Sequence, residues 1–309
     1  MRINRDAIGN ITIDQSRFVA NIVKKYLGNL EHAFLVHTPL PTDFIATVED
    51  CAKDDVEAQR FSIAYRMDYP SVLGSLIYLM NTRPVISFDV INLARFMKLP
   101  GRKHFLAITH LLHYLRCYRN YGVKYYVKPE DSPLHRFVEQ SGISLNDHIF
   151  GMYDSSWQDC PVSGRSTGCY FNFACGGVVD FSSFLPAPVA MSSTEAEMNA
   201  GAVAAMSMSY VRMLWNELNG QPADILWDPP IPMFCDNNGA VISANSDKDS
   251  KALRHTKRRM FFMRQLRKEK ELGYWFMDNK FMLADVGTKN VDGPKFKPVF
   301  NIILAEVPE

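Results

Sequence analysis

The chain has 309 residues, a formal net charge of +1, 47% hydrophobic residues and 22% charged residues. This is the composition of a globular protein long enough for two domains, and it excludes a partner recognised through bulk positive charge. Six scattered cysteines without a C-x-x-C pair argue against a zinc site or a disulfide framework and indicate a reducing compartment. Because no signal-peptide pattern and no apolar stretch of ~20 residues is present, we expect a soluble intracellular protein without a membrane partner.

The first half of the chain is expected to be mainly helical. Residues 1–45 predict a β-hairpin followed by an amphipathic helix, whereas the polar, acidic residues 46–68 predict a loop. A helical pattern continues over 69–127, interrupted near the prolines. Residues 128–147 place Pro, Gly and Ser among charges, so they predict a linker.

The pattern changes character from residue 148 onward. Three alternating segments predict strands, with Gly176-Gly177 as the turn between the second and the third. A long helix over about 194–218, a short strand in "PMFCDNN", two helices, a strand in "GYWFMD" and a helix opening in "MLADVGTK" follow. The order βββ-α-β-α-α-β-α implies a mixed sheet.

Four acidic side chains fall at the ends of these predicted elements. A parallel pairing of "MFCDNN" with "GMYDSS" would set Asp236 beside Asp154, near the carboxyl ends of the strands. The first turns of the long helix bring Glu197 to the same place, and Asp285 begins the last helix. Carboxylates this close would have raised pKa values unless cations neutralise them, and oxygen ligands suit Mg²⁺ or Mn²⁺. Singly, each aspartate also fits a loop or an N-cap, so the joint placement carries the hypothesis.

The stretch "MSSTEAEMNA" contains two glutamates that both fit a helix capping box. Ser192 with Glu195 has the S/T-x-x-E spacing, and so does Thr194 with Glu197. The residues alone leave open which glutamate caps the helix and which one faces a substrate.

The motifs together resemble the C-terminal part of a copia-type LTR retrotransposon polyprotein, the end of the reverse transcriptase followed by its RNase H domain. The resemblance covers almost the whole chain and is carried by "HTPLP", "YPSVLGSLIYLMN", "GRSTGCYFNF", "SSTEAEMNA", "MFCDNNGAV" and "LADVGTK". It implies an α/β protein with an RNase H-like mixed five-stranded sheet flanked by helices over 148–309. Before that domain it implies a reverse transcriptase remnant over 1–68, a helical thumb- or connection-like region over 69–127 and a linker over 128–147.

The resemblance also implies an activity, hydrolysis of the RNA strand of RNA/DNA hybrids with two Mg²⁺ or Mn²⁺ ions. The implied partners are the hybrid and the rest of the reverse transcriptase polyprotein, in the cytoplasm, a retroelement particle or the nucleus; the sequence carries no signal for an oligomeric state. Glu197 matches the family motif better than Glu195, which is left to cap the helix. The implied catalytic and metal-binding residues are Asp154, Glu197, Asp236 and Asp285. A Tyr-x-Asp-Asp motif is absent from the chain, so we expect no reverse transcriptase activity of its own.

A basic stretch over 251–270 supplies a second kind of functional candidate, a surface that follows phosphates. The predicted nucleic-acid-binding residues are Arg165, Ser166, Thr167, Asn237, Lys257, Arg258 and Arg259. The equal alternative for the stretch is a solvated helix face. Arg258 stands where the family usually has a histidine, and His255 lies three residues earlier. This departure and the truncated polymerase part favour an alternative, an inactive fragment that binds nucleic acid or packs against a polymerase.

Overall fold

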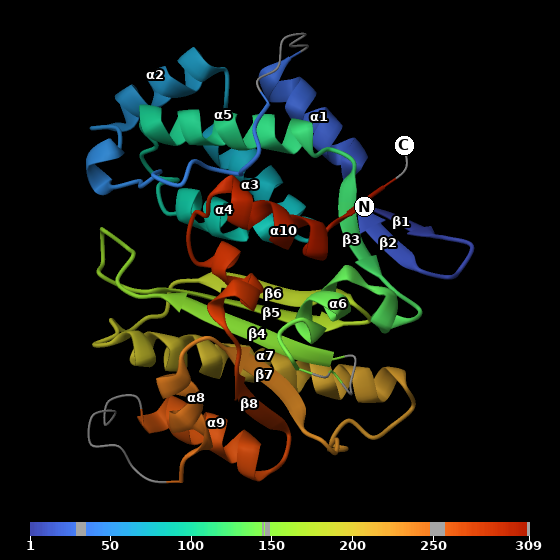
Figure 1. Cartoon of the computed structure of the whole chain (residues 1–309). Coiled ribbons are helices and arrows are strands. Elements are labelled where there is room, and N and C mark those ends of the chain that lie inside the picture. Colours follow the sequence, from blue (N-terminus) through green and yellow to red (C-terminus); the bar gives the residue numbers. More distant parts are fainter. Residues whose placement is uncertain (29–34, 144, 146–148, 248–256, 308–309) are drawn as a thin grey trace. The chain divides into compact units, whose positions relative to one another are not determined.

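The computed structural model describes residues 1–28, 35–143, 145, 149–247 and 257–307. Lys257 is described by its backbone alone. Within this part of the chain two structural units are present, and each is treated by itself (Figure 1). Unit 1 comprises Met1–Tyr125 and Asn290–Glu309, and unit 2 comprises Tyr126–Lys289.

Unit 1 combines an antiparallel sheet with helices from both ends of the chain. The strand order is β1-β2-β3-β9, formed by β1 (Arg2–Arg5), β2 (Ile11–Asp14), β3 (Tyr121–Tyr125) and β9 (Ala305–Glu306). Its α-helices are α1 (Ser16–Leu27), α2 (Asp55–Tyr65), α3 (Tyr69–Met80), α4 (Ser87–Ala94), α5 (Arg102–Cys117) and α10 (Gly293–Ile303). Two short 3₁₀ turns, η1 (Val48–Asp50) and η2 (Pro84–Ile86), lie between them.

The predicted hairpin and first helix of unit 1 are confirmed, but two predictions are wrong. The expected loop over 46–68 contains α2, whose N-terminus is capped by Asp54 accepting from the Glu57 amide over 2.8 Å. Because α2 buries none of its residues fully, it has no apolar period to detect. The helical pattern also does not continue to the end of 69–127, since β3 pairs there with β2, setting Val123 opposite Ile13.

The last twenty residues belong to unit 1 and not to a domain spanning 148–309. Phe300 of α10 packs against the rings of Tyr118 and Tyr121, with 4.8 Å between ring centroids in both pairs. The following strand, β9, pairs with β3. Aromatic burial and strand pairing therefore return the end of the chain to the first unit.

Unit 2 is built on a mixed five-stranded sheet of order β6-β5-β4-β7-β8. The strands are β4 (Ile149–Ser156), β5 (Thr167–Ala174), β6 (Gly177–Phe184), β7 (Ile231–Cys235) and β8 (Leu272–Phe276). The first three pair antiparallel, and β7 lies parallel to both β4 and β8. The predicted α/β class, the mixed sheet and the parallel neighbour of "MFCDNN" are confirmed.

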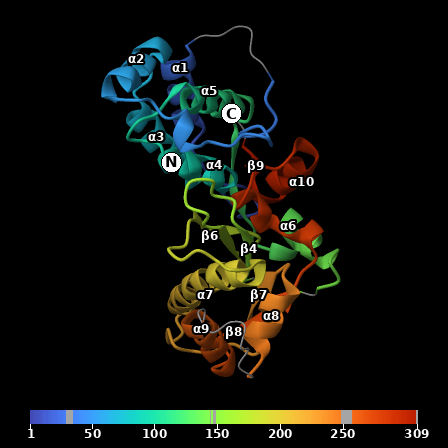
Figure 2. The same ribbon diagram turned by 90° about the vertical axis from the view of Figure 1, so that its left-hand side faces the viewer.

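One face of this sheet is covered by helices that share its core. Figure 1 shows α7 (Ser193–Leu218), α8 (Asn238–Asn245) and α9 (Lys257–Lys268) on the same side of the strands. In Figure 2, α7 lies between the sheet and α9, in agreement with its contacts to β4, β5 and α9. Gly201 allows this close packing, because a Cβ atom there would lie 2.8 Å from Cε2 of Tyr153 and 2.9 Å from Cε of Met263. The alanine-rich run of α7 thus brings the helix, and Glu197 with it, close to β4.

Three local predictions in unit 2 need correction. Part of the expected linker over 128–147 forms η3 (Pro129–Asp131) and α6 (Pro133–Glu139), whose N-cap Ser132 accepts from the His135 amide over 3.0 Å. The turn before β6 is made by Cys175 and Gly176, which both have positive φ, instead of Gly176-Gly177. "MLADVGTK" forms a 3₁₀ turn, η6 (Leu283–Gly287), after the shorter η5 (Asn279–Phe281).

None of the helices in the described part of the chain combines the length and the apolar character that crossing a membrane requires.

Candidate metal centre

Asp154 and Asp236 occupy matching positions on neighbouring parallel strands. Met152 of β4 pairs with Phe234 of β7, so the residues two positions further on reach the same level. Asp154 is buried near the end of β4, and Asp236, half-buried, directly follows the last residue of β7. The Oδ2 atom of Asp236 accepts a 2.8 Å hydrogen bond from the side-chain amide of Asn279, which fixes the carboxylate's orientation.

The two glutamates of α7 have different environments. The Ser192 hydroxyl caps the helix by accepting from the Glu195 amide over 3.1 Å, and the Glu195 carboxylate accepts from the Met191 amide over 2.9 Å. Glu195 therefore serves the helix end. Glu197, one residue further, points to the strands instead, and its Oε1 accepts from the Ser155 amide over 3.1 Å.

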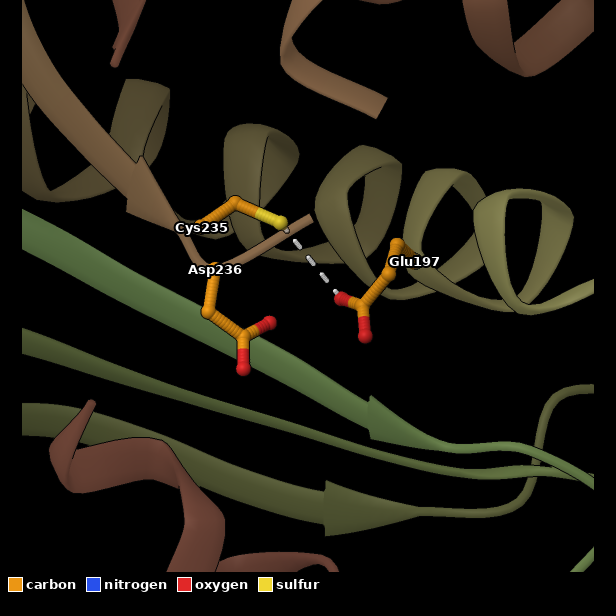
Figure 3. Close-up of side chains that lie close together, drawn as sticks. All are labelled: Glu197, Cys235 and Asp236. Carbon is orange, nitrogen blue, oxygen red and sulfur yellow. Dashed lines mark hydrogen bonds between the residues drawn. The ribbon is translucent and has the colours of Figure 1, made fainter. Parts of the chain in front are cut away.

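Glu197 and Asp236 meet at one place together with a thiol. Ligand atoms of Glu197, Cys235 and Asp236 all lie within 4.8 Å of one another, and in the described part of the chain this is the group of three that geometry assigns to a possible metal ion. Figure 3 shows the Cys235 thiol pointing at the Glu197 carboxylate, with the Asp236 carboxylate beside them. Sγ of Cys235 lies 3.6 Å from Oε2 of Glu197.

Asp154 and Asp285 lie outside that group of three and have partners of their own. Oδ2 of Asp154 accepts a 2.6 Å hydrogen bond from the Thr288 hydroxyl. Asp285, completely buried in η6, has its Oδ1 2.7 Å from Nζ of Lys289. The turn η6 therefore contributes the acid Asp285. The two residues that follow the turn, Thr288 and Lys289, stabilise Asp154 and Asp285.

The electrostatics of the cluster disfavour negative charge. Burial, and then the charge of Asp285, raise the pKa of Asp154 to about 7. Burial, followed by the charges of Asp154 and Asp236, raises the pKa of Glu197 as well. Burial works against the charge of Lys289, but its hydrogen bond to Asp285 and the charge of Asp154 outweigh this and raise its pKa. Carboxyl groups in such a site need either protons or cations.

This donor set fits a divalent cation. The carboxylates of Glu197 and Asp236 are within reach of one shared ion and are oriented by Ser155 and Asn279. Their oxygen atoms suit Mg²⁺ or Mn²⁺, and the raised pKa of Glu197 means that a bound cation would relieve an existing electrostatic cost. Thr288 contacts one carboxylate oxygen of Asp154 and Lys289 one of Asp285, and each carboxylate has a second oxygen that could serve as a metal ligand.

Comparison with known proteins shows similarity to retrotransposon polyproteins. The chain is 28% identical over 230 residues to the retrovirus-related Pol polyprotein from transposon RE1 of Arabidopsis thaliana, covering 74% of the chain and 14% of that protein. It is 24% identical over 308 residues to the Pol polyprotein from transposon TNT 1-94 of Nicotiana tabacum, covering 96% of the chain and 20% of the relative. The chain thus resembles the Pol polyproteins of plant copia-type retrotransposons.

The chain spans a fifth or less of the length of the polyproteins named above. A secreted RxLR effector protein 161 of Plasmopara viticola is 31% identical over 133 residues, covering 43% of the chain and 82% of the effector. No family model and no solved structure matches the chain.

The predicted nucleic-acid contacts of the chain include three side chains with internal roles. Ser166 and Thr167 are buried. The Ser166 hydroxyl accepts from the Gln158 amide over 3.1 Å, and the Thr167 hydroxyl donates to Asp159 over 2.6 Å. Asn237 caps α8 by accepting from the Ala240 amide over 3.0 Å. These side chains hold the loop before β5 and the start of α8. Of the three consecutive residues 165–167, only the half-buried Arg165 therefore reaches the surface.

The basic helix α9 divides its charges between packing and solvent. Arg264 is buried and donates from Nε to the Ser243 carbonyl over 2.9 Å. Arg259 is half-buried and donates to the Asn199 side chain over 2.6 Å. Arg258 is exposed. Residues 251–256, with His255, and the side chain of Lys257 lie outside the described residues.

Sequence reasoning missed four residues that shape the centre, namely Cys235, Asn279, Thr288 and Lys289. A signal was present for three of them, since Thr288 and Lys289 belong to the quoted motif "LADVGTK" and Cys235 to "MFCDNNGAV". Cys235 immediately precedes Asp236, and strand alternation puts consecutive side chains on opposite faces. Strand β7 ends at Cys235, so the alternation of side chains does not apply to Asp236. The Cys235 and Asp236 side chains can therefore reach the same site.

Proposed function

We propose that unit 2 is the RNase H domain of a copia-type Pol polyprotein and hydrolyses the RNA strand of RNA/DNA hybrids with Mg²⁺ or Mn²⁺. The observation that carries the proposal is the convergence of acids from β4, α7, the end of β7 and η6 at one end of a mixed sheet. Similarity to Pol polyproteins supports a nucleic-acid substrate, because the names of these relatives describe them as retrovirus-related. The chain lacks the Tyr-x-Asp-Asp motif, so the proposal includes no DNA synthesis.

The residues of the centre have distinct roles in this proposal. Glu197 and Asp236 would hold the first of two cations. Hydrogen bonds from Ser155 and Asn279 orient these two carboxylates. Asp154 and Asp285, which contact Thr288 and Lys289 through one oxygen each, would complete the acidic site and hold the second ion. When bound, the cations supply the charge neutralisation and the polarised water that phosphodiester hydrolysis needs.

Substrate recognition in this proposal depends on the backbone of the hybrid. Arg258 is exposed and Arg165 is half-buried, and the guanidinium groups of both suit phosphate contacts. Contacts to phosphates and 2′-hydroxyls recognise a hybrid by its shape with little dependence on sequence.

The proposal is tested by incubating the full chain with an end-labelled RNA/DNA hybrid and Mg²⁺. The parent should cleave the RNA strand only, and Asp236→Asn should lower the rate by about a hundredfold or more, a loss of the order seen when one charge-stabilising group is removed from an active site. Asp224→Asn is the matched control, because Asp224 is an exposed aspartate of the same unit. Equal cleavage by all three chains, or cleavage without added metal, would contradict the proposal.

A second candidate function is favoured by one observation. All four acids already have partners within the chain, and Asp285 is paired with a cationic one, Lys289. A non-catalytic segment that binds hybrids or packs against a polymerase would keep such partners permanently. Salt-sensitive hybrid binding by the parent without any cleavage, under the conditions above, would select this second function.

A further inference from the structure

The last residue of β7 places a buried thiol inside the acidic centre. Cys235 is completely buried, and its Sγ approaches Oε2 of Glu197 to 3.6 Å. The backbone amide of Asn237 also points at this sulfur atom over 3.4 Å. Asp236 supplies a carboxylate oxygen within 4.8 Å of both other ligand atoms, as Figure 3 shows. One sulfur and two oxygen donors therefore surround a common space.

The spacing of these donors matches a tetrahedral site for a thiophilic ion. A Zn–S distance of about 2.3 Å and a Zn–O distance of about 2.0 Å at a tetrahedral angle put sulfur and oxygen about 3.5 Å apart. The observed separation between Sγ of Cys235 and Oε2 of Glu197 is 3.6 Å. Two donors thus already have nearly the required distance, and a carboxylate oxygen of Asp236 lies within 4.8 Å of both as the third.

The mixed donor set also distinguishes between metals. Mg²⁺ requires near-octahedral oxygen ligands and gains nothing from a sulfur atom. Zn²⁺ and Cd²⁺ bind thiolate well, and three protein ligands with one open position are a common zinc arrangement. A bound ion also deprotonates a coordinating thiol, so the proton of Cys235 passes to solvent as the metal enters.

We propose that Glu197, Cys235 and Asp236 form a binding site for Zn²⁺ or Cd²⁺, which excludes Mg²⁺ from the same two carboxylates. Binding itself depends only on the three side chains. The consequence that zinc inhibits catalysis rests on the proposed nuclease function. Cys235 thus sets which cations the centre accepts.

Binding is tested by titrating the full, metal-free chain with CdCl₂ and following the ultraviolet thiolate-to-cadmium charge-transfer band. The parent should show one equivalent of this band that is absent from Cys235→Ser and weakened at least about tenfold in affinity in Asp236→Asn. Cys160→Ser is the matched control, because it removes another buried cysteine of unit 2, and it should titrate like the parent. An unchanged titration of Cys235→Ser would overturn the proposal.

A measurement on the parent alone protects the test against a variant that fails to fold. X-ray absorption spectra of the chain loaded with one equivalent of ZnCl₂ should show one sulfur neighbour at about 2.3 Å and oxygen neighbours at about 2.0 Å. A shell containing oxygen and nitrogen only would overturn the assignment of Cys235.

The cleavage assay separates this inference from the proposed function. In the presence of Mg²⁺, added ZnCl₂ should inhibit the parent at a concentration at least about tenfold lower than it inhibits Cys235→Ser, each chain being compared with its own rate without zinc. Sulfur-coordinated zinc in a parent that never cleaves would uphold the metal site and remove the nuclease. Cleavage that zinc inhibits equally in both chains would uphold the nuclease and overturn the role of Cys235.

Discussion

The Thr288 hydroxyl donates to Oδ2 of Asp154 over 2.6 Å, although the two residues are 134 positions apart in the sequence. This bond lowers the pKa of Asp154 against the larger effect of burial. Thr288→Val keeps the shape of the side chain and removes the donor, which costs about 1.5–3 kcal/mol where the acceptor is charged. We expect the acidic limb of the cleavage pH profile to move to higher pH. Thr109→Val, which removes a hydroxyl bound only to helix backbone in unit 1, should leave the profile in place.

Lys289 is expected to stabilise the centre when metal is absent. Its ammonium group lies 2.7 Å from buried Asp285, so Lys289→Met leaves that carboxylate without its cation. In EDTA the melting temperature of the variant should fall by a few degrees, while its Mg²⁺ affinity should rise about threefold to tenfold because a competing charge is gone. Differential scanning calorimetry with and without MgCl₂ measures both effects. Lys297→Met, at an exposed lysine of α10, is the control, and an equal response there would contradict the prediction.

The stability of the metal-free chain should depend on the protonation of Asp154. Its pKa in the folded chain is about 7, above the ordinary value of 3.8, so the proton binds the folded state preferentially. The stabilisation is present in full below about pH 4 and is lost as the pH rises through 7. Asp154→Asn should remove about 1–3 kcal/mol of this dependence between pH 4 and 8. Chemical denaturation in EDTA at several pH values tests it, and parallel curves for the two chains would contradict it.

Asp89 of α4 gives a second pH prediction, in unit 1. Burial raises its pKa to about 8, so its contribution to stability is lost as the pH rises from 4 through 8. Asp89→Asn should therefore be more stable than the parent at pH 9 and show no such gain at pH 5.

Asp14 has a pKa shift of the opposite sign. Burial acts to raise its pKa, but the hydrogen bonds from Arg2 and Ser16 outweigh burial and lower it. Asp14→Asn should be less stable than the parent from about pH 5 upward, as thermal unfolding would show.

The two environments found on α9 predict different defects for two arginines. Arg258 is exposed, and Arg258→Ala should weaken hybrid binding about threefold to tenfold at low salt and reduce the salt slope by about one. Arg264 is buried and bonded to the Ser243 carbonyl, and Arg264→Ala should cost about 2–3 kcal/mol of stability. Fluorescence anisotropy with a labelled hybrid at several salt concentrations, together with thermal unfolding, separates the two effects. Loss of stability in Arg258→Ala would show that its charge also serves packing.

The sheet of unit 2 could be predicted because its pattern is local. Strands β4, β5 and β6 follow one another in the sequence and pair antiparallel, and a helix crossover before β7 forces the parallel pairing with β4. From that predicted pairing, Asp154 was expected beside Asp236 before the structure was known. Helix α2 and strand β3 were missed for the opposite reason, since α2 buries no face and β3 has only five residues directly after a long helix.

The detailed geometry of the centre could not be read from periodicity. Sequence spacing placed Glu197 on the first turns of α7, but its distance to Cys235 depends on where β7 ends and how closely Gly201 lets α7 approach. The pairing of Asp285 with Lys289 depends on a 3₁₀ turn that was expected to be a helix. Side chains at the ends of elements follow no repeat, so contacts among them appear only in the folded chain.

The return of α10 and β9 to the first unit sets an order of events during translation. Unit 2 is a continuous insertion, and its last residue leaves the ribosome while strand β3 still lacks its second neighbour. The metal centre can therefore form on the nascent chain before the surrounding unit is complete, since domains fold as units during synthesis. A stop codon between residues 290 and 304 would spare every acid of the centre and deprive the other unit of strand β9.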